Sequence, residues 1–457
     1  MSTQQKKSKY EIDMCNGSIL DKLISFSIPL MLSGILQLLF NAVDIIVVGR
    51  FTGSEALAAV GSTTALINVF VNFFIGISLG SNVLAARFYA AGKDKEMSET
   101  VHTAITLALI SGIVMGIVGV VSAKGALQLM DTPDNVLDLS TLYMRIYFVG
   151  MPFFMLYNYG AAILRAVGDT KRPLMFLIVS GATNVVLNLI LVIRFHLGVA
   201  GVAIATVISQ GISCVLVLRC LYYSEGSYQL RFPKLGMKAR YVKQIFQVGV
   251  PAGIQSTIIN FSNVLLQSSV NSFGSVAMAG YTAANNILGF LYVSVNSITQ
   301  ACMSFTSQNY GVRKFKRMDR ILLECLGLTV TVSLIFGGGS YLFGSELMHI
   351  YTKSADVVAC GTDIMLYTTV TYFLCGIMDL FPGALRGMGH SAVPMILSVV
   401  GTVGTRIVWI YWVFPQHRAL DFLFISYPVS WILTIVMQVI CFYFVRKRVH
   451  GKEGLIQ

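Results

Sequence analysis

The stretch Ile163-Leu-Arg-Ala-Val-Gly-Asp-Thr-Lys-Arg-Pro173 returns 221 residues later as Ala384-Leu-Arg-Gly-Met-Gly-His-Ser-Ala-Val-Pro394. Leu-Arg, a later Gly and the final Pro stand at the same places in both stretches. Other matches at a spacing of 221 or 222 residues pair Pro29 with Pro251, Asn41 with Asn263, and Gly53, Ala56 and Ala58 with Gly274, Ala277 and Ala279. Because these matches cover most of each half at a nearly constant spacing, the sequence indicates an internal duplication.

The composition decides what kind of unit is duplicated. Hydrophobic residues make up 55% of the chain, charged residues only 12%, and the mean hydropathy is +0.72. These values lie far outside the range of soluble globular proteins. Long apolar runs recur, and about 20 such residues span a hydrocarbon core of roughly 30 Å as a helix. The composition therefore predicts an integral membrane protein.

We count twelve such runs, six in each copy. They are continuous and do not alternate between apolar and polar residues, so they predict an all-α membrane protein and not a barrel. The predicted spans are 24–48, 56–86, 99–121, 137–160, 174–194 and 199–222 in the first copy, and 245–270, 278–306, 320–343, 361–386, 394–414 and 421–445 in the second.

The distribution of charge predicts the orientation and the domains. With the N-terminus inside, the inner segments hold 26 of the 33 Lys and Arg residues and the outer segments hold five. This asymmetry follows the positive-inside rule and predicts that both termini are cytoplasmic. We expect an N-lobe of six helices over 1–222, a cytoplasmic linker over 223–244, and a C-lobe over 245–457 of six helices and a basic tail.

The same observations exclude several classes of protein. The net charge of +12 is mostly a matter of topology, so we do not expect nucleic acid as a partner. The chain has no GxxxxGK[ST] loop for ATP, and its eight cysteines and six histidines lack the spacing of a metal site. We therefore expect no enzyme, no cofactor and no structural metal. No cleavable signal is apparent at the N-terminus.

Two copies with an even number of spans enter the membrane in the same orientation, and therefore form parallel repeats. Transporters with such repeats usually form a central cavity between two lobes and open it alternately to each side. The duplication thus favours a secondary transporter in the cell membrane. We expect it to act as a monomer.

Four segments carry a family resemblance. They are Ile28-Pro-Leu-Met-Leu with Leu39-Phe-Asn-Ala-Val-Asp44, then Ala85-Ala-Arg-Phe-Tyr-Ala-Ala-Gly-Lys93, Ala162-Ile-Leu-Arg-Ala-Val-Gly-Asp-Thr-Lys-Arg-Pro173 and Gly201-Val-Ala-Ile-Ala-Thr206. The chain resembles the multidrug and toxic compound extrusion (MATE) family over nearly its whole length, with a pattern nearer the DinF-like than the NorM-like members. The resemblance implies export of organic cations or other amphipathic compounds in exchange for protons or sodium ions.

Asp44 is the main candidate for ion coupling, because ionisable residues at membrane depth are costly and tend to be functional. It lies in the outer part of the first predicted span. Such a carboxylate can carry a proton, or hold Na⁺ when it is ionised. A purely structural ion pair between Asp44 and Arg145, which lies in the outer half of its own span, is the alternative.

The fifth and sixth spans supply neutral companions for Asp44. Asn184 and Asn188 are one helical turn apart on one face, and Thr206 lies at a similar depth. Many DinF-like relatives resemble this chain but hold a second Asp at the position of Asn188, which puts a two-carboxylate mechanism in doubt. We add Asn41 to this predicted ion-coupling group.

The second copy is not equivalent to the first. The carboxylates that NorM-like relatives carry on helices 7 and 10 have no clear counterpart, and helix 7 offers Asn260 and Asn263. Asp379 lies near the inner end of its span and pairs with Asn158 in the repeat, which indicates an inner gate, helix packing or ion binding. Arg406 has no basic counterpart in the first copy, where Val185 stands at the equivalent place. It could repel cationic drugs or bind an anionic substrate, so the sequence does not decide the charge of the substrate.

Further residues are assigned on weaker grounds. Met and aromatic side chains suit promiscuous binding, although in membrane helices they more often face lipid or a neighbouring helix. We expect Tyr281, Asn285, Met278 and Met303 to line the substrate cavity. The residues predicted to lie in that cavity or at its gate also include Asn158, Asp379, Arg406, Arg145, Asn260 and Asn263. Pro29 and Pro251 stand at matched positions inside spans, where each removes a backbone donor, and are predicted hinges.

Other functions remain open at this point. The wider superfamily includes flippases for lipid-linked oligosaccharides or peptidoglycan precursors, which commonly have extra helices and a more cationic cavity. A membrane enzyme or a channel is less well supported, because no nucleophile or carboxylate cluster lies on one face. The sequence does not fix the coupling ion or the cargo.

Overall fold

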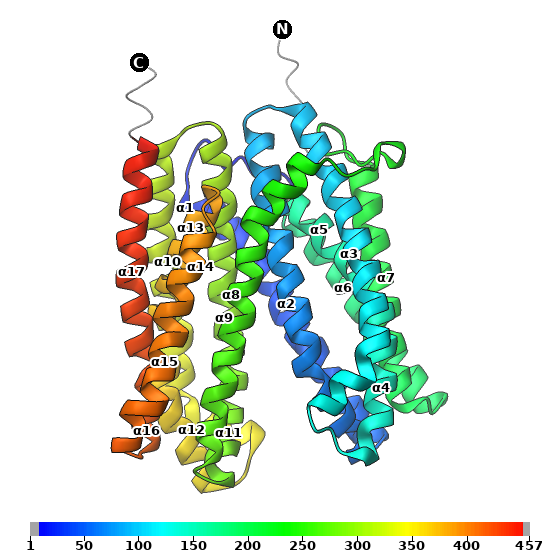
Figure 1. Cartoon of the computed structure of the whole chain (residues 1–457), viewed down its shortest axis with the longest axis vertical. Helices are drawn as coiled ribbons and strands as arrows, with labels where there is room; N and C mark the ends of the chain where they lie inside the picture. The colour runs from blue at the N-terminus through cyan, green and yellow to red at the C-terminus, as the bar shows by residue number, and fades with distance from the viewer. Residues whose placement is uncertain (1–8, 451–457) are drawn as a thin grey trace. The chain divides into compact units, whose positions relative to one another are not determined.

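The computed structural model describes residues 9–450, and every regular element within that range is helical (Figure 1). The first half contains α1 (Leu20–Phe51), α2 (Ser54–Ala90), α3 (Asp94–Leu129), α4 (Asp134–Val149), α5 (Met151–Ala166), α6 (Lys171–Asn188), the π-helical turn η1 (Leu189–Arg194) and α7 (Gly198–Tyr222). A short 3-10 turn, η2 (Phe232–Lys234), lies between the halves.

The second half repeats this series with more interruptions. It contains α8 (Ala239–Asn271), α9 (Ser275–Gly311), α10 (Phe315–Leu342), α11 (Gly344–Tyr351), α12 (Ala355–Thr368), α13 (Tyr372–Gly387), α14 (Ala392–Ser398), η3 (Val399–Gly404), α15 (Thr405–Val408), η4 (Trp409–Val413), η5 (Phe414–Gln416), α16 (Leu420–Phe424) and α17 (Ser426–His450). The helix predicted for each of the twelve spans is present, so the all-α membrane fold is confirmed.

Two of the predicted continuous spans are bent. The span predicted over 137–160 is α4 and α5, which meet at 46°, and the span over 361–386 is α12 and α13, which meet at 42°. Pro152 follows the first break and cannot donate a backbone hydrogen bond there. At the second break the hydroxyls of Thr369 and Thr371 bond back to the carbonyls of Met365 and Tyr367, an arrangement that often bends helices.

One predicted span is less apolar than the others. Within residues 9–450, nine helical segments are long and apolar enough to cross a membrane, and the two bent pairs raise that number to eleven. The twelfth helix is α8, whose 33 residues are ample for a crossing but include many polar side chains. Polar residues in a membrane helix usually face the protein interior or a cavity.

The two halves share their packing and their turns. In the first, α5 packs against α2, α3 and α7; in the second, α13 packs against α9, α10 and α17, which follow in the same order. The repeated Gly168 and Gly389 both adopt left-handed backbone conformations, with φ of +94° and +88°. Only glycine takes up such angles without strain, which explains why both copies of the motif hold it.

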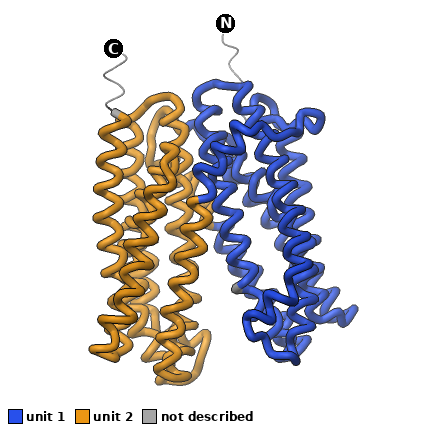
Figure 2. The backbone as a smooth tube through the Cα atoms, viewed as in Figure 1, with its two compact units in different colours: residues 1–13, 32–250 blue, residues 14–31, 251–457 orange. Residues whose placement is uncertain are grey.

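The helices form two compact units that do not coincide with the predicted lobes. Unit 1 comprises residues 1–13 and 32–250, and unit 2 comprises 14–31 and 251–457 (Figure 2). The first part of α1 therefore belongs to unit 2, and the first part of α8 belongs to unit 1. The boundary crosses α1 shortly after Pro29 and crosses α8 immediately before Pro251.

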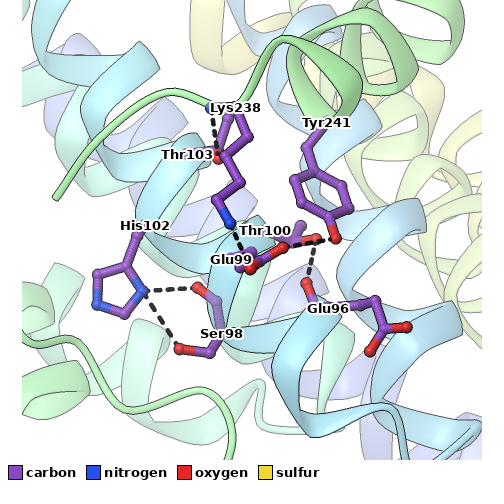
Figure 3. A network of polar contacts seen from close by, with 8 residues as sticks. All are labelled: Glu96, Ser98, Glu99, Thr100, His102, Thr103, Lys238 and Tyr241. Carbon is purple, nitrogen blue, oxygen red and sulfur yellow. Dashed lines mark hydrogen bonds and ion pairs between the residues drawn. The ribbon is translucent and has the colours of Figure 1, made fainter. Parts of the chain in front are cut away.

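The linker is shorter than predicted, because α8 already begins at Ala239. Figure 3 shows the contacts that fix the end of the linker and the start of α8 to α3. Glu99 pairs with Lys238 and accepts a hydrogen bond of 2.8 Å from the Tyr241 hydroxyl, while the backbone N–H of Lys238 donates to Thr103 over 3.4 Å. These contacts with α3 place the first turns of α8 in unit 1.

Residues 9–13, at the start of the described part of the chain, are also fixed to unit 1. The Glu11 carboxylate accepts hydrogen bonds from the hydroxyls of Tyr89 and Tyr228 over 2.7 and 2.6 Å. Burial and the hydrogen bond to Glu11 raise the pKa of Tyr228, which lies in the linker, to about 12. Tyr228 therefore keeps its proton and remains a donor at physiological pH.

Candidate functional site

The first site builds around Asp44, which α1 carries in its second half. The residues next to Asp44 in the chain are apolar, and Asp44 is the only carboxylate in the second half of α1. α6 and α7 pack against each other and bring Asn184, Asn188 and Thr206 to it. All four residues belong to unit 1.

The contacts form a continuous chain of polar groups. The amide nitrogen of Asn188 donates to the Asp44 carboxylate, and the same nitrogen lies 3.1 Å from Oδ1 of Asn184. Nδ2 of Asn184 is 3.5 Å from the Thr206 hydroxyl, which is also a hydrogen-bonding neighbour of Asp44. The structure thus brings together four of the five residues predicted for ion coupling.

Among the hydrogen bonds of residues 9–450, none joins the fifth residue, Asn41, to this group of four. Its side chain is exposed, although it is on the same helix as Asp44. Asn41 and Asp44 are three positions apart, less than one helical turn of 3.6 residues, so helical phase alone does not place them on different faces. Side chains of α6 and α7 form hydrogen bonds with Asp44.

The alternative ion pair of Asp44 with Arg145 does not form. Nε of Arg145 donates to the backbone carbonyl of Val120 over 3.2 Å, and the side chain is turned to the exposed side of α4. Across residues 9–450, the ion pairs include none between these two side chains. Asp44 is therefore surrounded by neutral groups.

The set of donor atoms suits a hard cation. Carboxylate, amide and hydroxyl oxygens converge from three helices, and such oxygens are preferred by hard ions such as Na⁺. Oδ1 of Asn188 is buried and has no hydrogen-bond partner among the described residues. A buried acceptor that is left unpaired is costly, and a bound cation or a protonated carboxyl would satisfy it.

Sequence reasoning missed two tyrosines beside this group. Tyr143 and Tyr147, one turn apart on α4, both interact electrostatically with Asp44, and their rings stack with centroids 6.3 Å apart. Gln210 of α7 is a neighbour of the Tyr147 hydroxyl. Their i, i+4 spacing on the face of α4 that packs against α7 was the available signal, but it is also the pattern of an ordinary packed helix.

A second group lies in unit 2 around Arg406. Nη1 of Arg406 donates to Oδ1 of Asn263 over 2.9 Å, and the guanidinium carbon lies 4.3 Å from the centre of the Tyr427 ring. The hydroxyls of Tyr427 and Tyr281 are 3.3 Å apart. Three of the residues predicted for a cavity or gate thus meet here, together with Tyr427, which the sequence did not single out.

The remaining predicted residues do not join either group. Asp379 interacts with Arg386 and lies beside Tyr292, while the amide of Asn158 bonds back to the carbonyl of Phe154 within its own helix. Met303 is buried at 3% exposure. The side chains that lie on exposed faces are those of Asn260, Asn285 and Met278.

The hinge candidates stand where the two units exchange helices. The boundary in α1 falls between Met31 and Leu32, two residues after Pro29, and the boundary in α8 falls directly before Pro251. Within residues 9–450, no group of three or more His, Cys, Asp or Glu side chains is arranged to hold a metal ion.

Comparison with known families gives two matches along the chain. The family model named MatE matches residues 29–190 and again residues 251–412. The two matched segments begin at Pro29 and Pro251, the same pair that the internal repeat aligns. The double match agrees with a duplicated chain.

Curated relatives match almost the whole length of the chain. The probable multidrug resistance protein YoeA of Bacillus subtilis (strain 168) is 29% identical over 444 residues, which are 95% of this chain and 94% of that protein. The multidrug export protein MepA of Staphylococcus haemolyticus (strain JCSC1435) is 22% identical over 430 residues, 93% of this chain and 92% of that one.

Solved structures confirm the fold. The outward-facing conformation of a multidrug resistance MATE family transporter superposes with a TM-score of 0.90 at 20% identity, and covers 98% of this chain and 100% of that chain. A crystal structure of MATE in the bent conformation gives a TM-score of 0.87 at 20% identity, over 98% of this chain and 99% of that chain. At this level of identity the likeness concerns the fold alone.

Proposed function

Because this chain belongs to the MATE family, we propose that it is a secondary antiporter that exports amphipathic, often cationic, compounds in exchange for H⁺ or Na⁺. The chain is a multi-pass membrane protein, and its relatives of similar length are named as multidrug resistance or multidrug export proteins. The proposal places the protein in the cell membrane with both termini in the cytoplasm.

The observation that carries the proposal is the Asp44 group. A carboxylate at membrane depth with three neutral partners and no basic one has little to hold it permanently ionised. Its charge can therefore be neutralised by a proton or by Na⁺, the two coupling ions that the proposal allows. A carboxylate locked to an Arg would not be free to exchange an ion.

Asn188 supplies a way to respond to the bound ion. Its Nδ2 donates to Asp44, which suits an ionised carboxylate, while its Oδ1 has no partner. A half turn of the amide presents Oδ1 instead, which accepts a hydrogen bond from protonated Asp44 or ligates Na⁺ at the carboxylate. Ion binding would thus change the hydrogen bonds between α1 and α6.

This change couples to transport through α1. Asp44 lies in the part of α1 that belongs to unit 1, whereas the part that includes Pro29 belongs to unit 2. A rearrangement at Asp44 acts on a helix that both units share, and proline inside that helix weakens its resistance to bending. We propose that the two six-helix repeats alternate access by a rocker-switch movement with this helix as a hinge.

Export can be tested in cells that lack their own efflux pumps. Cells that express the chain should accumulate less ethidium than cells with an empty vector, and dissipation of the proton gradient, or of the sodium gradient, should restore accumulation. Ethidium levels that are the same with and without the protein, under either gradient, would contradict the proposal.

A flippase for lipid-linked oligosaccharides or peptidoglycan precursors is the alternative function. It would use a cationic cavity for a pyrophosphate group, and the first site offers a carboxylate surrounded by neutral groups. Such a flippase would leave ethidium accumulation unchanged but would restore growth to cells depleted of their own precursor flippase. The antiporter proposal predicts no such rescue.

A further inference from the structure

A groove on unit 1 follows the bend between α4 and α5. α4 ends at Val149, α5 begins at Met151, and the two helices meet at 46°. α3 passes this bend in close contact, since a Cβ at Gly112 would come within 2.6 Å of Cα of Pro152. The groove has a volume of about 350 Å³, and its lining consists of Ile113, Gly116, Ile117, Val120, Val121, Val149 and Pro152, all of them apolar.

The outer rim of the groove is exposed. The side chains of Ile117, Val121 and Val149 are 61%, 75% and 59% exposed. Apolar side chains that stay exposed on a membrane-spanning helix contact lipid, because hydrocarbon surrounds that part of the chain. A volume of about 350 Å³ lies within the range of roughly 300–1,000 Å³ that small-molecule sites occupy. The groove is therefore large enough to hold part of one lipid molecule in place.

Arg145 stands at the edge of this groove. Its Nε donates to the backbone carbonyl of Val120 over 3.2 Å, and Val149 follows one helical turn later on α4. Both valines belong to the lining of the groove. Arg145 is exposed, and within residues 9–450 it forms no ion pair. The hydrogen bond to Val120 thus fixes the guanidinium through Nε and leaves its two Nη groups available.

The charges near Arg145 leave this edge of the groove positive. On α3, Lys124 lies one turn after Val120 and pairs with Asp138 of α4 across 3.7 Å. That carboxylate and that ammonium group neutralise each other, whereas the guanidinium of Arg145 keeps its charge. An apolar groove with one unpaired cation at its edge has the chemistry of a site for an anionic amphiphile.

We propose that this groove binds one anionic phospholipid, with an acyl chain along residues 113–121 of α3 and the phosphate at Arg145. A guanidinium matches a phosphate through two parallel hydrogen bonds. Val120 lies at the outer end of the span predicted over 99–121, the level at which lipid headgroups begin. A zwitterionic lipid offers the same chains without the net charge, and inorganic phosphate offers the charge without the chains.

A lipid in the groove would contact α3, the end of α4 and the start of α5 at once. The bend interrupts the backbone hydrogen bonds of a long span, because Pro152 cannot donate one. A ligand that binds only the folded protein stabilises it by mass action, so the lipid would favour the bent arrangement. The site faces the outer leaflet in the proposed orientation, but binding depends neither on that orientation nor on export.

Photolabelling of the purified full-length protein in phosphatidylcholine nanodiscs tests the site. The probe is phosphatidylglycerol with a diazirine on one acyl chain, and phosphatidylcholine with the same labelled chain is the reference. Residues 113–121 should be labelled about fivefold more by the anionic probe, which corresponds to about 1 kcal/mol for one basic residue near an anionic headgroup. The exposed apolar face of α17 at residues 432–440 should be labelled equally by both. Equal labelling of residues 113–121 would overturn the proposal.

Two arginine variants test the place of the phosphate. Arg145→Met should reduce the labelling of residues 113–121 by the anionic probe to the level of the reference probe. Arg194→Met, which removes an exposed cation in η1 of the same unit, should leave the preference intact. Loss of the preference in both variants, or in neither, would contradict a phosphate site at Arg145.

Ile117→Trp tests the groove while Arg145 stays in place, and covers the case in which Arg145→Met does not fold. The indole would occupy the groove from an exposed position, so the melting temperature should be unchanged. Labelling of residues 149–152 by the anionic probe should fall severalfold. Undiminished labelling there would refute the groove as the place of the acyl chain.

Competition separates a phospholipid from a free anion. Excess unlabelled phosphatidylglycerol should prevent the labelling of residues 113–121, and inorganic phosphate at the same concentration should not. Equal protection by inorganic phosphate would overturn the assignment to a lipid. Export is measured separately with ethidium in cells, so a failure of the antiporter proposal leaves the outcome of this experiment unchanged.

Discussion

Asp44 and Asn188 show how far single residues can be predicted from sequence. The depth of Asp44 in an apolar helix and the one-turn spacing of Asn184 and Asn188 were sufficient to group them. Asn41 shows where such reasoning ends: helical phase places a side chain on a face, but only tertiary packing decides which neighbour covers that face. For the same reason, the sequence did not predict that Tyr143, Tyr147 and Tyr427 lie beside the two polar groups.

The role of Asn188 leads to a prediction at this scale. Asn188→Leu removes the amide that donates to Asp44 and leaves the carboxylate with one fewer partner. We expect a loss of about 1–3 kcal/mol of stability, the usual cost of a buried polar group left without its partner. Thermal unfolding of the purified protein measures it, with ethidium efflux as the functional readout.

Asn135→Leu is the matched control, because Asn135 lies on an exposed face of α4. Stability and efflux should be nearly unchanged in that variant. If Asn188→Leu behaves in the same way as Asn135→Leu, then the contact with Asp44 contributes neither to the fold nor to coupling.

At the scale of single helices, the breaks within helices are the main features that a hydropathy profile does not predict. Twelve apolar runs predicted the helices, but not the bends of 46° and 42°. A hydropathy profile averages over some 20 residues, so it does not register a single Pro or a pair of Thr residues that interrupts the backbone hydrogen bonds. The repeated prolines, in contrast, were visible because the duplication aligned them.

Pro29 leads to a prediction for α1. Pro29→Ala restores a backbone donor inside the helix and favours a straight conformation. Transport of ethidium should therefore slow, while the equilibrium affinity for ethidium changes little, because the substitution lies about four turns before Asp44. Turnover measured in proteoliposomes, together with binding in detergent, separates the two effects. Unaltered turnover would refute the hinge.

The turn between α5 and α6 gives a prediction for stability. Gly168 has φ of +94°, and a Cβ there would come within 2.6 Å of backbone atoms of Ile12. Gly168→Ala should therefore destabilise the protein by more than about 1 kcal/mol. Gly125→Ala is the control, because a Cβ at this helical glycine meets nothing within 4 Å and alanine favours helix. Equal melting temperatures of the two variants would show that residue 168 does not require glycine.

For the whole molecule, the duplication predicted the architecture but not its division. The internal repeat placed the halves on either side of a linker, whereas the compact units exchange the first parts of α1 and α8. An alignment of repeats compares sequences, and it does not predict the unit in which a helix segment packs. The exchange makes α1 and α8 the helices that both units share, which is where a movement of one unit against the other must be accommodated.

Transport driven by an imposed gradient, in proteoliposomes with the wild type and Asp44→Asn, tests the central claim most directly. The wild type should accumulate ethidium against its gradient when a proton or sodium gradient is imposed. Asp44→Asn should remain folded but lose the response to that gradient, because an amide cannot exchange a proton and lacks the charge that holds Na⁺. Asp138→Asn, at a carboxylate whose side chain is 91% exposed, should retain it. Gradient-driven accumulation by Asp44→Asn at the wild-type rate would contradict the account.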